Sequence, residues 1–355
     1  MTRTLLFTCA LALLFCIDAQ ARDKNILLLH PVAVKNLPFS SVSVSDIRAI
    51  RTDLGFTHSG IFNRIRIMNF SQPLAKELQQ FHNNVLSNPV RQNKLLIAVK
   101  QLFVHEKIGA FREHGYFAFA AVYFMSTDTD SLRYEKIMEV DTIFECKGGE
   151  VTEKLISSVS TGMAAILSLA GEKAIHRLPA QRTYSYDEAA DLINTEKKLI
   201  PLYNLTGPPA RGIYKDFTAL KNNTPTETAL EIDTVSSRSK LFLRPAVNEG
   251  KSKKIEPGTV YAVCDGTTLY ISTDKGFYKL RKEKSDFVFI GRSSKLSINS
   301  SPNIAVMAGA MAGGLVGGIV MGSIVNSESP VLCKFLVDPL SGNLIFIETK
   351  EPTDW

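Results

Sequence analysis

The sequence lacks the short motifs that mark common catalytic and cofactor sites. No G-x-G-x-x-G fingerprint, phosphate-binding loop or G-x-S-x-G nucleophile elbow occurs in its 355 residues. Histidine is scarce, and the nearest approach to a metal site, His105-Glu106 with Glu113-His114, lacks the i, i+4 spacing of a metalloprotease helix. We expect both pairs in solvated loops at strand ends. The sequence therefore predicts no catalytic residue, no cofactor and no metal.

Cysteine is too rare for a disulfide scaffold. Of the five cysteines, Cys9 and Cys16 lie in a segment that we expect to be removed, which leaves Cys146, Cys264 and Cys333. Three scattered cysteines form at most one disulfide. Each lies in an apolar run, which favours a buried and unreactive thiol.

The N-terminus has the pattern of a secretory signal peptide over residues 1–21. Arg3 supplies the positive region, Leu5 to Ile17 the apolar core, and Ala19-Gln20-Ala21 the cleavage site. An uncleaved anchor is the alternative, but the apolar core has only about 13 residues where a span needs about 20. The pattern predicts an exported protein of the periplasm or cell envelope.

Charge of either sign is modest. The net charge of +6 is unchanged by cleavage, because Arg3 and Asp18 leave together. The densest basic clusters are residues 251–254 and 279–284, which a solvated strand face explains; attraction to anionic lipid headgroups or glycans is the alternative. We expect no nucleic-acid partner.

Hydrophobic periodicity predicts an α+β fold, with a mixed α/β domain over residues 22–205. Strands are expected at 26–34, 94–104, 116–125 and 132–144, and helices near 74–86, 151–176 and 186–197. In 132–144, apolar residues including Tyr134 and Val140 alternate with Arg133, Glu135, Glu139 and Asp141. That alternation predicts a sheet with one face in solvent.

Residues 206–355 predict a mainly antiparallel β domain. Gly207-Pro208-Pro209 marks the boundary, and Gly212 to Phe217 indicates a short edge strand followed by a helical turn that stops at Pro225. Further strands are expected at 240–244, 259–263, 268–272, 277–281, 287–291, 331–337 and 344–349. Turn residues such as Ser341-Gly342-Asn343 separate them as hairpins require.

An uncharged apolar stretch, residues 304–325, interrupts this domain. Glycines recur every fourth position in two rows, Gly309, Gly313, Gly317 and Gly314, Gly318, Gly322. On a helix each row forms a groove that admits another backbone, as in membrane helix pairs. This glycine zipper predicts a helix that packs in a membrane or on copies of itself.

Three interpretations of the zipper remain open. A transmembrane helix fits the length of about 33 Å against a hydrocarbon core of ~30 Å. However, the flanking charges oppose the positive-inside rule, and a span would separate the last two strands from the rest of their sheet. The alternatives are a hairpin or helix inserted from one side of the membrane, and a helix packed in protein.

Several motifs resemble a pattern in exported envelope proteins of Bacteroidetes-type Gram-negative bacteria. They are GIYKDFTALKNNTP, VYAVCDGTTLYIS, GFYKLRK, FVFIGR, the glycine-rich segment and LVDPLSGNLIFIE, with GIFNR and NKLLIAVKQLFV upstream. The resemblance covers most of the mature chain. It implies an envelope location and supplies no catalytic residue.

The sequence thus favours a non-enzymatic envelope protein that associates through 304–325 with a membrane or with its own copies. An exported hydrolase or carbohydrate-active enzyme, with a site assembled from loops, is the alternative. Paired carboxylates or a histidine touching a serine in a cleft would favour that enzyme.

Overall fold

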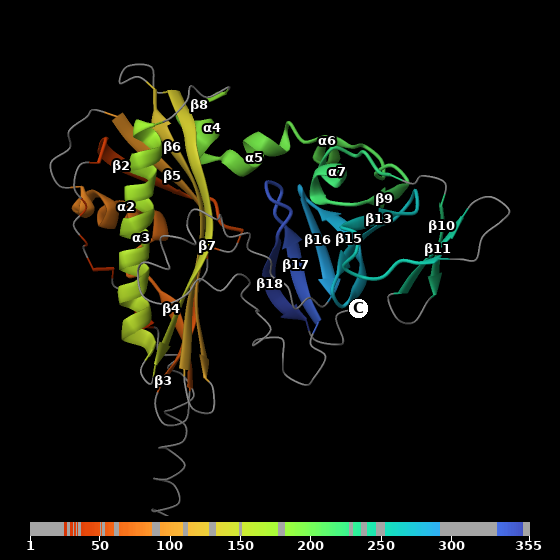
Figure 1. Cartoon of the computed structure of the whole chain (residues 1–355), viewed down its shortest axis with the longest axis horizontal. Coiled ribbons are helices and arrows are strands. Elements are labelled where there is room, and N and C mark those ends of the chain that lie inside the picture. Colours follow the sequence, from red (N-terminus) through yellow and green to blue (C-terminus); the bar gives the residue numbers. More distant parts are fainter. Residues whose placement is uncertain are drawn as a thin grey trace, which may run out of the picture.

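The computed structural model contains two large sheets, each with its own helices, and this confirms the predicted α+β class (Figure 1). It describes residues 25–350 apart from 27–28, 31, 33, 35–36, 50, 52–53, 60–63, 87–92, 109–112, 128–132, 149–150, 177–181, 227–229, 236–239, 246–252 and 292–331. We refer to residues 25–197 as the N-terminal part and to residues 201–350 as the C-terminal part.

The sheet of the N-terminal part is mixed, with strand order β1-β4-β3-β5-β6-β7-β8 and β2 paired to β5. Its centre is an antiparallel meander of three long strands, which lie where the sequence predicts strands. The bounds are β1 Asn25–Ile26, β2 Phe39–Asp46, β3 Gly55–Ser59, β4 Arg64–Asn69, β5 Asn93–Ile108, β6 Glu113–Ser126, β7 Arg133–Gly148 and β8 Thr183–Ser185. Both β2 and β3 run parallel to β5, along successive halves of its length.

Two helices, α2 (Leu74–Val85) and α3 (Val151–Ile175), cover one face of this sheet (Figure 1). The inner side of α3 carries Leu155, Val159, Met163 and Ile166 at the spacing of an amphipathic helix, and all four are buried. They join the apolar side chains of β5 and β6 in the largest hydrophobic core. The predicted helix at 151–176 is confirmed.

α3 is also long and apolar enough to cross a membrane, by length and composition alone. Most of its apolar stretch is buried inside the protein, however, where it packs on β6 and β7. A buried position of this kind is typical of a core helix.

The opposite face of the sheet is covered by α4 (Tyr186–Ala190) and α5 (Leu192–Lys197). The predicted single helix over 186–197 is wrong in this respect, because Asp191 leaves helical geometry with φ −114° and ψ 43°. α4 begins with a capping box between Ser185 and Glu188. Ala189 and Leu192 pack on the sheet in a second core.

The C-terminal part is built on an antiparallel sheet with strand order β18-β17-β16-β15-β14-β13-β9. The bounds are β9 Gly212–Tyr214, β13 Ala262–Cys264, β14 Leu269–Thr273, β15 Gly276–Glu283, β16 Asp286–Gly291, β17 Leu332–Val337 and β18 Leu344–Lys350. Helices α6 (Pro201–Asn204) and α7 (Phe217–Lys221) lie beside it, and β10 (Leu230–Val235), β11 (Lys240–Pro245) and β12 (Lys253–Lys254) form a separate small sheet. The edge strand and helical turn expected at 212–225 are confirmed by β9 and α7.

Several observed strands differ from those expected. Of the strand expected at 26–34, only Ile26 lies in a strand, and residues 27–28, 31 and 33 lie outside the described residues. The strand expected at 259–263 lies at Ala262–Cys264, and β2, β3, β4 and β10 were not expected; in β2, serines dilute the apolar pattern. In β7, a register shift opposite Tyr123 and Phe124 changes which face each residue occupies. As a result Tyr134 and Val140 belong to cores on opposite faces of the sheet.

Candidate functional site: a charged cluster between the two sheets

The face of the N-terminal sheet that was expected in solvent is partly covered by a turn from the other end of the chain. This docking turn, residues 338–343, joins β17 to β18, and Figure 1 shows these strands on the side facing β7. Leu340 packs against the core that α4 and α5 share with the sheet. Glu139 and Asp141 share this face, as expected, but the register shift in β7 interrupts the expected alternation, and the docking turn covers part of the face that was expected in solvent.

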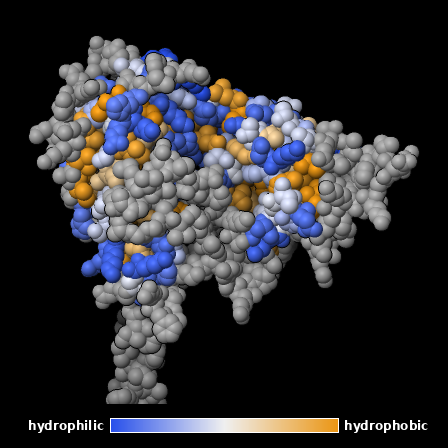
Figure 2. Space-filling model, in the orientation of Figure 1, coloured by the Kyte–Doolittle hydropathy of each residue, from blue (hydrophilic) through white to orange (hydrophobic). Residues whose placement is uncertain are grey.

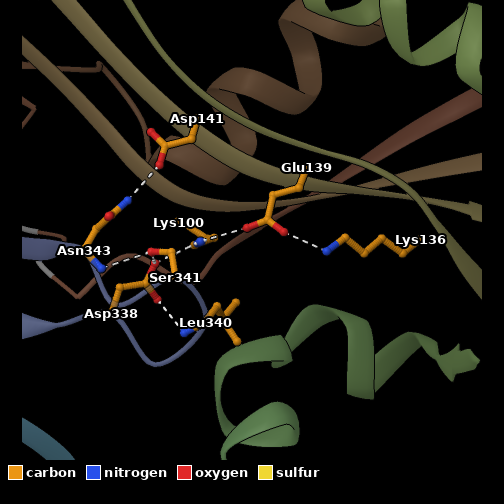
Figure 3. Close-up of polar contacts among 8 residues, drawn as sticks. All are labelled: Lys100, Lys136, Glu139, Asp141, Asp338, Leu340, Ser341 and Asn343. Carbon is orange, nitrogen blue, oxygen red and sulfur yellow. Dashed lines mark hydrogen bonds and ion pairs between the residues drawn. The ribbon is translucent and has the colours of Figure 1, made fainter. Parts of the chain in front are cut away.

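Around Leu340 lies the charged cluster, which we define as Lys100, Glu139, Asp141, Asp338 and Asn343 (Figure 3). Lys100 projects from β5, and its side chain is only 5% exposed. Its Nζ lies 3.1 Å from Glu139 Oε1 on β7 and 2.9 Å from Asp338 Oδ2 in the docking turn. One buried ammonium therefore ties the two parts together.

The electrostatics of the cluster keep Lys100 charged. Burial by itself would lower the pKa of Lys100, but the carboxylates of Asp338 and Glu139 outweigh that effect and raise it. Burial likewise acts to raise the pKa of Glu139, and attraction to Lys100 and Lys136 lowers it instead. Lys100 is thus a protonated partner of two carboxylates and is unsuited to act as a nucleophile.

Asp141 is the exception in this group. Its Oδ2 accepts a hydrogen bond from Asn343 Nδ2 at 3.1 Å, and its Oδ1 is buried without a hydrogen-bond partner among the described residues. Burial raises the pKa of Asp141 from 3.8 to about 7; Lys100 opposes the rise, while Asp338 and Glu139 add to it. Asp141 therefore exchanges its proton near neutral pH.

The docking turn is held in shape by its own side chains. Asp338 accepts hydrogen bonds from the Leu340 amide at 3.0 Å and from Ser341 Oγ at 2.6 Å, in addition to its ion pair with Lys100. Gly342 has φ +76°, and a Cβ there would lie 2.3 Å from Cγ of Phe217. Only glycine fits this position, so the Ser341-Gly342-Asn343 turn predicted from the sequence is confirmed.

A second polar contact joins the two parts beside the cluster. The ammonium of Lys197, at the end of α5, pairs with Asp286 on β16. Within the C-terminal part, Lys282 on β15 donates from Nζ to the backbone carbonyl oxygen of Tyr203 on α6 at 2.7 Å. The Lys197–Asp286 pair and the charged cluster together orient the C-terminal sheet against the N-terminal one.

The histidine and glutamate pairs that come nearest to a metal-site pattern in the sequence do not form a metal site in the structure. Contrary to the loop expectation, His105 and Glu106 lie within β5, and Glu113 and His114 within β6. His114 Nδ1 lies 2.9 Å from Glu145, whereas Glu106 accepts a hydrogen bond from Thr152 Oγ1 at 2.6 Å. Across the part of the chain that the structure describes, no three His, Cys, Asp or Glu residues are grouped to hold a metal ion.

The free cysteines agree with the sequence-based expectation. Cys264 is buried and Cys146 is partly buried, and burial raises the pKa of both thiols, that of Cys146 to about 11. Such thiols are weak nucleophiles at neutral pH.

Sequence reasoning missed the charged cluster. The available signal was Lys100, which is a lone charge in an apolar strand, LLIAVKQLFV.

The zipper glycines, Gly309, Gly313, Gly314, Gly317, Gly318 and Gly322, lie outside the described residues. Hydrophobic and hydrophilic residues are intermixed on the visible face in Figure 2, and the exposed large hydrophobic residues among those described are Ile175, Tyr186 and Leu199.

Comparison of the chain with models of known protein families, with curated proteins and with solved structures gives no match.

Proposed function

We propose that this is a non-enzymatic envelope protein that attaches to a membrane, or to its own copies, through residues 304–325. The observation that carries the proposal is the uncharged glycine-zipper sequence of this segment, which cannot rest in water over its length without a covering surface. The secretory signal pattern of residues 1–21 supports an extracytoplasmic location.

The strands that flank the segment favour one mode of attachment. β16 ends at Gly291 and β17 begins at Leu332, and Gly291 lies opposite Cys333 in the antiparallel pair. The intervening chain therefore leaves the sheet and returns to it at the same end. Entry into a membrane from one side is compatible with that pairing.

A single crossing is hard to reconcile with the same pairing. After a crossing by 304–325, only residues 326–331 would be left to return to β17, and they extend about 20 Å at most against a hydrocarbon core of ~30 Å. They would also carry the polar run Asn326 to Ser329 through the membrane. We therefore propose that residues 304–325 enter the membrane from one side, as a hairpin or as a single inserted helix. Each of the two arms of such a hairpin would have about nine residues and would reach ~14 Å as a helix.

Cell fractionation tests attachment. We expect the mature protein to resist carbonate extraction and to dissolve in detergent, whereas a variant with 304–325 replaced by a Gly-Ser linker of equal length is released by buffer. The linker keeps the connection between β16 and β17, so the antiparallel pair of these two strands is retained in both proteins. Recovery of the unmodified protein in the soluble fraction would refute attachment to the membrane.

Cysteine labelling separates one-sided insertion from a span. Ser300→Cys and Ser327→Cys flank the segment, and a membrane-impermeant maleimide applied to spheroplasts should label both of them if the segment enters and leaves on one side. Labelling of only one position would indicate a crossing. The unmodified chain measures background labelling of Cys146, Cys264 and Cys333.

Self-association through the grooves is tested by bulky substitutions. Gly313→Leu with Gly317→Leu should reduce crosslinking between copies, because leucine fills the groove where another backbone would approach. Gly207→Leu is the matched control, since a Cβ at Gly207 meets nothing within 4 Å. Equal crosslinking in all three proteins would argue against the groove.

The alternative, an exported hydrolase or carbohydrate-active enzyme, gains no support from the described carboxylates. Glu139 and Asp338 converge on Lys100, and Asp141 on Asn343. These contacts favour docking between the two parts over hydrolysis.

A further inference from the structure

The docking turn reaches the N-terminal sheet through three kinds of contact. Leu340 supplies an apolar contact with the core beneath α4 and α5. Asp338 forms the ion pair with Lys100, and Asn343 donates to Asp141. All three come from residues 338–343, whereas Lys100 and Asp141 belong to strands more than 190 residues earlier in the chain.

The charges at this contact do not balance when every group is ionised. Docking brings the carboxylate of Asp338 close to those of Glu139 and Asp141. The cations are Lys100, at the centre, and Lys136, which pairs with Glu139 from the outer side at 2.6 Å. Three carboxylates therefore face two ammonium groups. The tyrosines that face Asp338, Tyr203 and Tyr261, stay neutral because burial raises their pKa values. The strand residue opposite Asp141 on β6 is Ala120, which carries no charge.

Asp141 is the group that can relieve this excess of negative charge. One of its oxygens is buried without a partner, so a proton there neutralises a carboxylate and breaks no hydrogen bond observed in the structure. Neutral Asp141 still accepts from Asn343 through its other oxygen.

We propose that the docking turn is a proton-linked latch between the two parts: the docked state takes up a proton on Asp141, and docking weakens as that proton is lost.

The direction of the pH effect follows from linkage. Burial among like charges holds the pKa of Asp141 at about 7 when the turn is docked, against an ordinary value of 3.8. Undocking exposes Asp141 and removes Asp338, so its pKa returns toward that ordinary value. At a pH between these two pKa values, docking is therefore accompanied by uptake of a proton on Asp141. The equilibrium constant for docking should fall about tenfold from pH 6 to pH 8.

Hydrogen exchange of residues 338–343 tests the latch in the full-length mature protein. After correction for intrinsic exchange, protection of the turn in the wild type should fall about tenfold from pH 6 to pH 8. Asp141→Asn mimics the neutral carboxyl and should keep its protection constant over that range. Asp187→Asn, at an exposed position on α4, is the matched control and should follow the wild type.

A carboxyl NMR titration provides a test that does not depend on the folding of Asp141→Asn. The Asp141 carboxyl of the wild type should titrate near 7, and its midpoint should fall by at least one pH unit in Leu340→Ser, which loses the apolar contact of the turn. A wild-type midpoint near 4 would overturn the latch. So would an unchanged midpoint in Leu340→Ser, or equal pH dependence of turn protection in wild type and Asp141→Asn.

Discussion

The two faces of the N-terminal sheet are covered in different ways. One face packs on α2 and α3, which are close in sequence to the strands they cover, through an almost wholly apolar core. The other receives α4, α5 and a turn from the far end of the chain, and charged groups make the contact with that turn. The first face stabilises the fold mainly by burial of apolar side chains, whereas the second also brings ionisable groups of the two parts into contact.

The largest expected effect is on the helix-covered face. Leu167→Ala removes a fully buried side chain of α3, and we expect the free energy of unfolding to fall by about 3 to 5 kcal/mol. Denaturant titration at pH 6 and pH 8 should give the same loss, since no ionisable group is changed. A loss below about 1 kcal/mol would contradict the assignment of Leu167 to a tightly packed core.

On the turn-covered face, Lys100→Met should cost about 3 kcal/mol at pH 8, because it leaves Glu139 and Asp338 without their shared cation. The loss should be smaller at pH 6, where Asp141 is largely protonated. Denaturant titration at both pH values measures the difference. An equal loss at both would show that Asp141 does not share the charge balance of Lys100.

His82 provides a pH test of the helix-covered face itself. Its ring nitrogens are buried without hydrogen-bond partners among the described residues, and burial lowers the pKa of His82 from 6.5 to about 3. The unfolded chain then binds a proton that the folded chain cannot, so stability falls as pH drops below 6.5. At pH 5 this amounts to about 2 kcal/mol.

Substitution of His82 isolates that contribution. His82→Leu should lose about 2 kcal/mol less stability than the wild type between pH 7 and pH 5, as measured by thermal or denaturant unfolding. Parallel pH profiles of the two proteins would show that His82 is protonated in the folded state.

The smallest effect is expected at the rim of the charged cluster. Lys136 pairs with Glu139 at 2.6 Å, but its side chain is 43% exposed. Lys136→Ala should change the free energy of unfolding by less than about 0.5 kcal/mol, because solvent screens exposed ion pairs. A change as large as that of Lys100→Met would mean that the outer pair, too, is shielded from solvent.

Much of the fold was predictable because its elements carry local periodicity. The β5, β6 and β7 meander and α3 follow from runs of alternating or helically spaced apolar residues, and most strands of the C-terminal sheet follow from turn residues between such runs. β2 was missed because its inward residues, Phe39, Val42 and Val44, are separated by serines. The two faces of β7 were misassigned because a register shift is a property of strand pairing that leaves no mark on the strand's own sequence.

The charged cluster could be predicted only in fragments. Glu139 and Asp141 were placed on the polar side of β7, and Ser341-Gly342-Asn343 was recognised as a turn. Nothing local indicated that these two features meet, since the strand and the turn are distant in sequence. Lys100 is a single charged residue within an apolar strand, and its ion pairs with Glu139 and Asp338 explain why it can be buried there.

The sequence by itself determined the α+β class, the elements with strong periodicity and the apolar, glycine-rich character of 304–325, because these depend on neighbouring residues. Tertiary structure alone decided that the polar face of β7 is partly covered, that Lys100 is buried between two carboxylates, and that burial and neighbouring carboxylates raise the pKa of Asp141. Burial and charge pairing depend on which distant groups are brought within a few ångströms, and that is set by the packing of the whole chain.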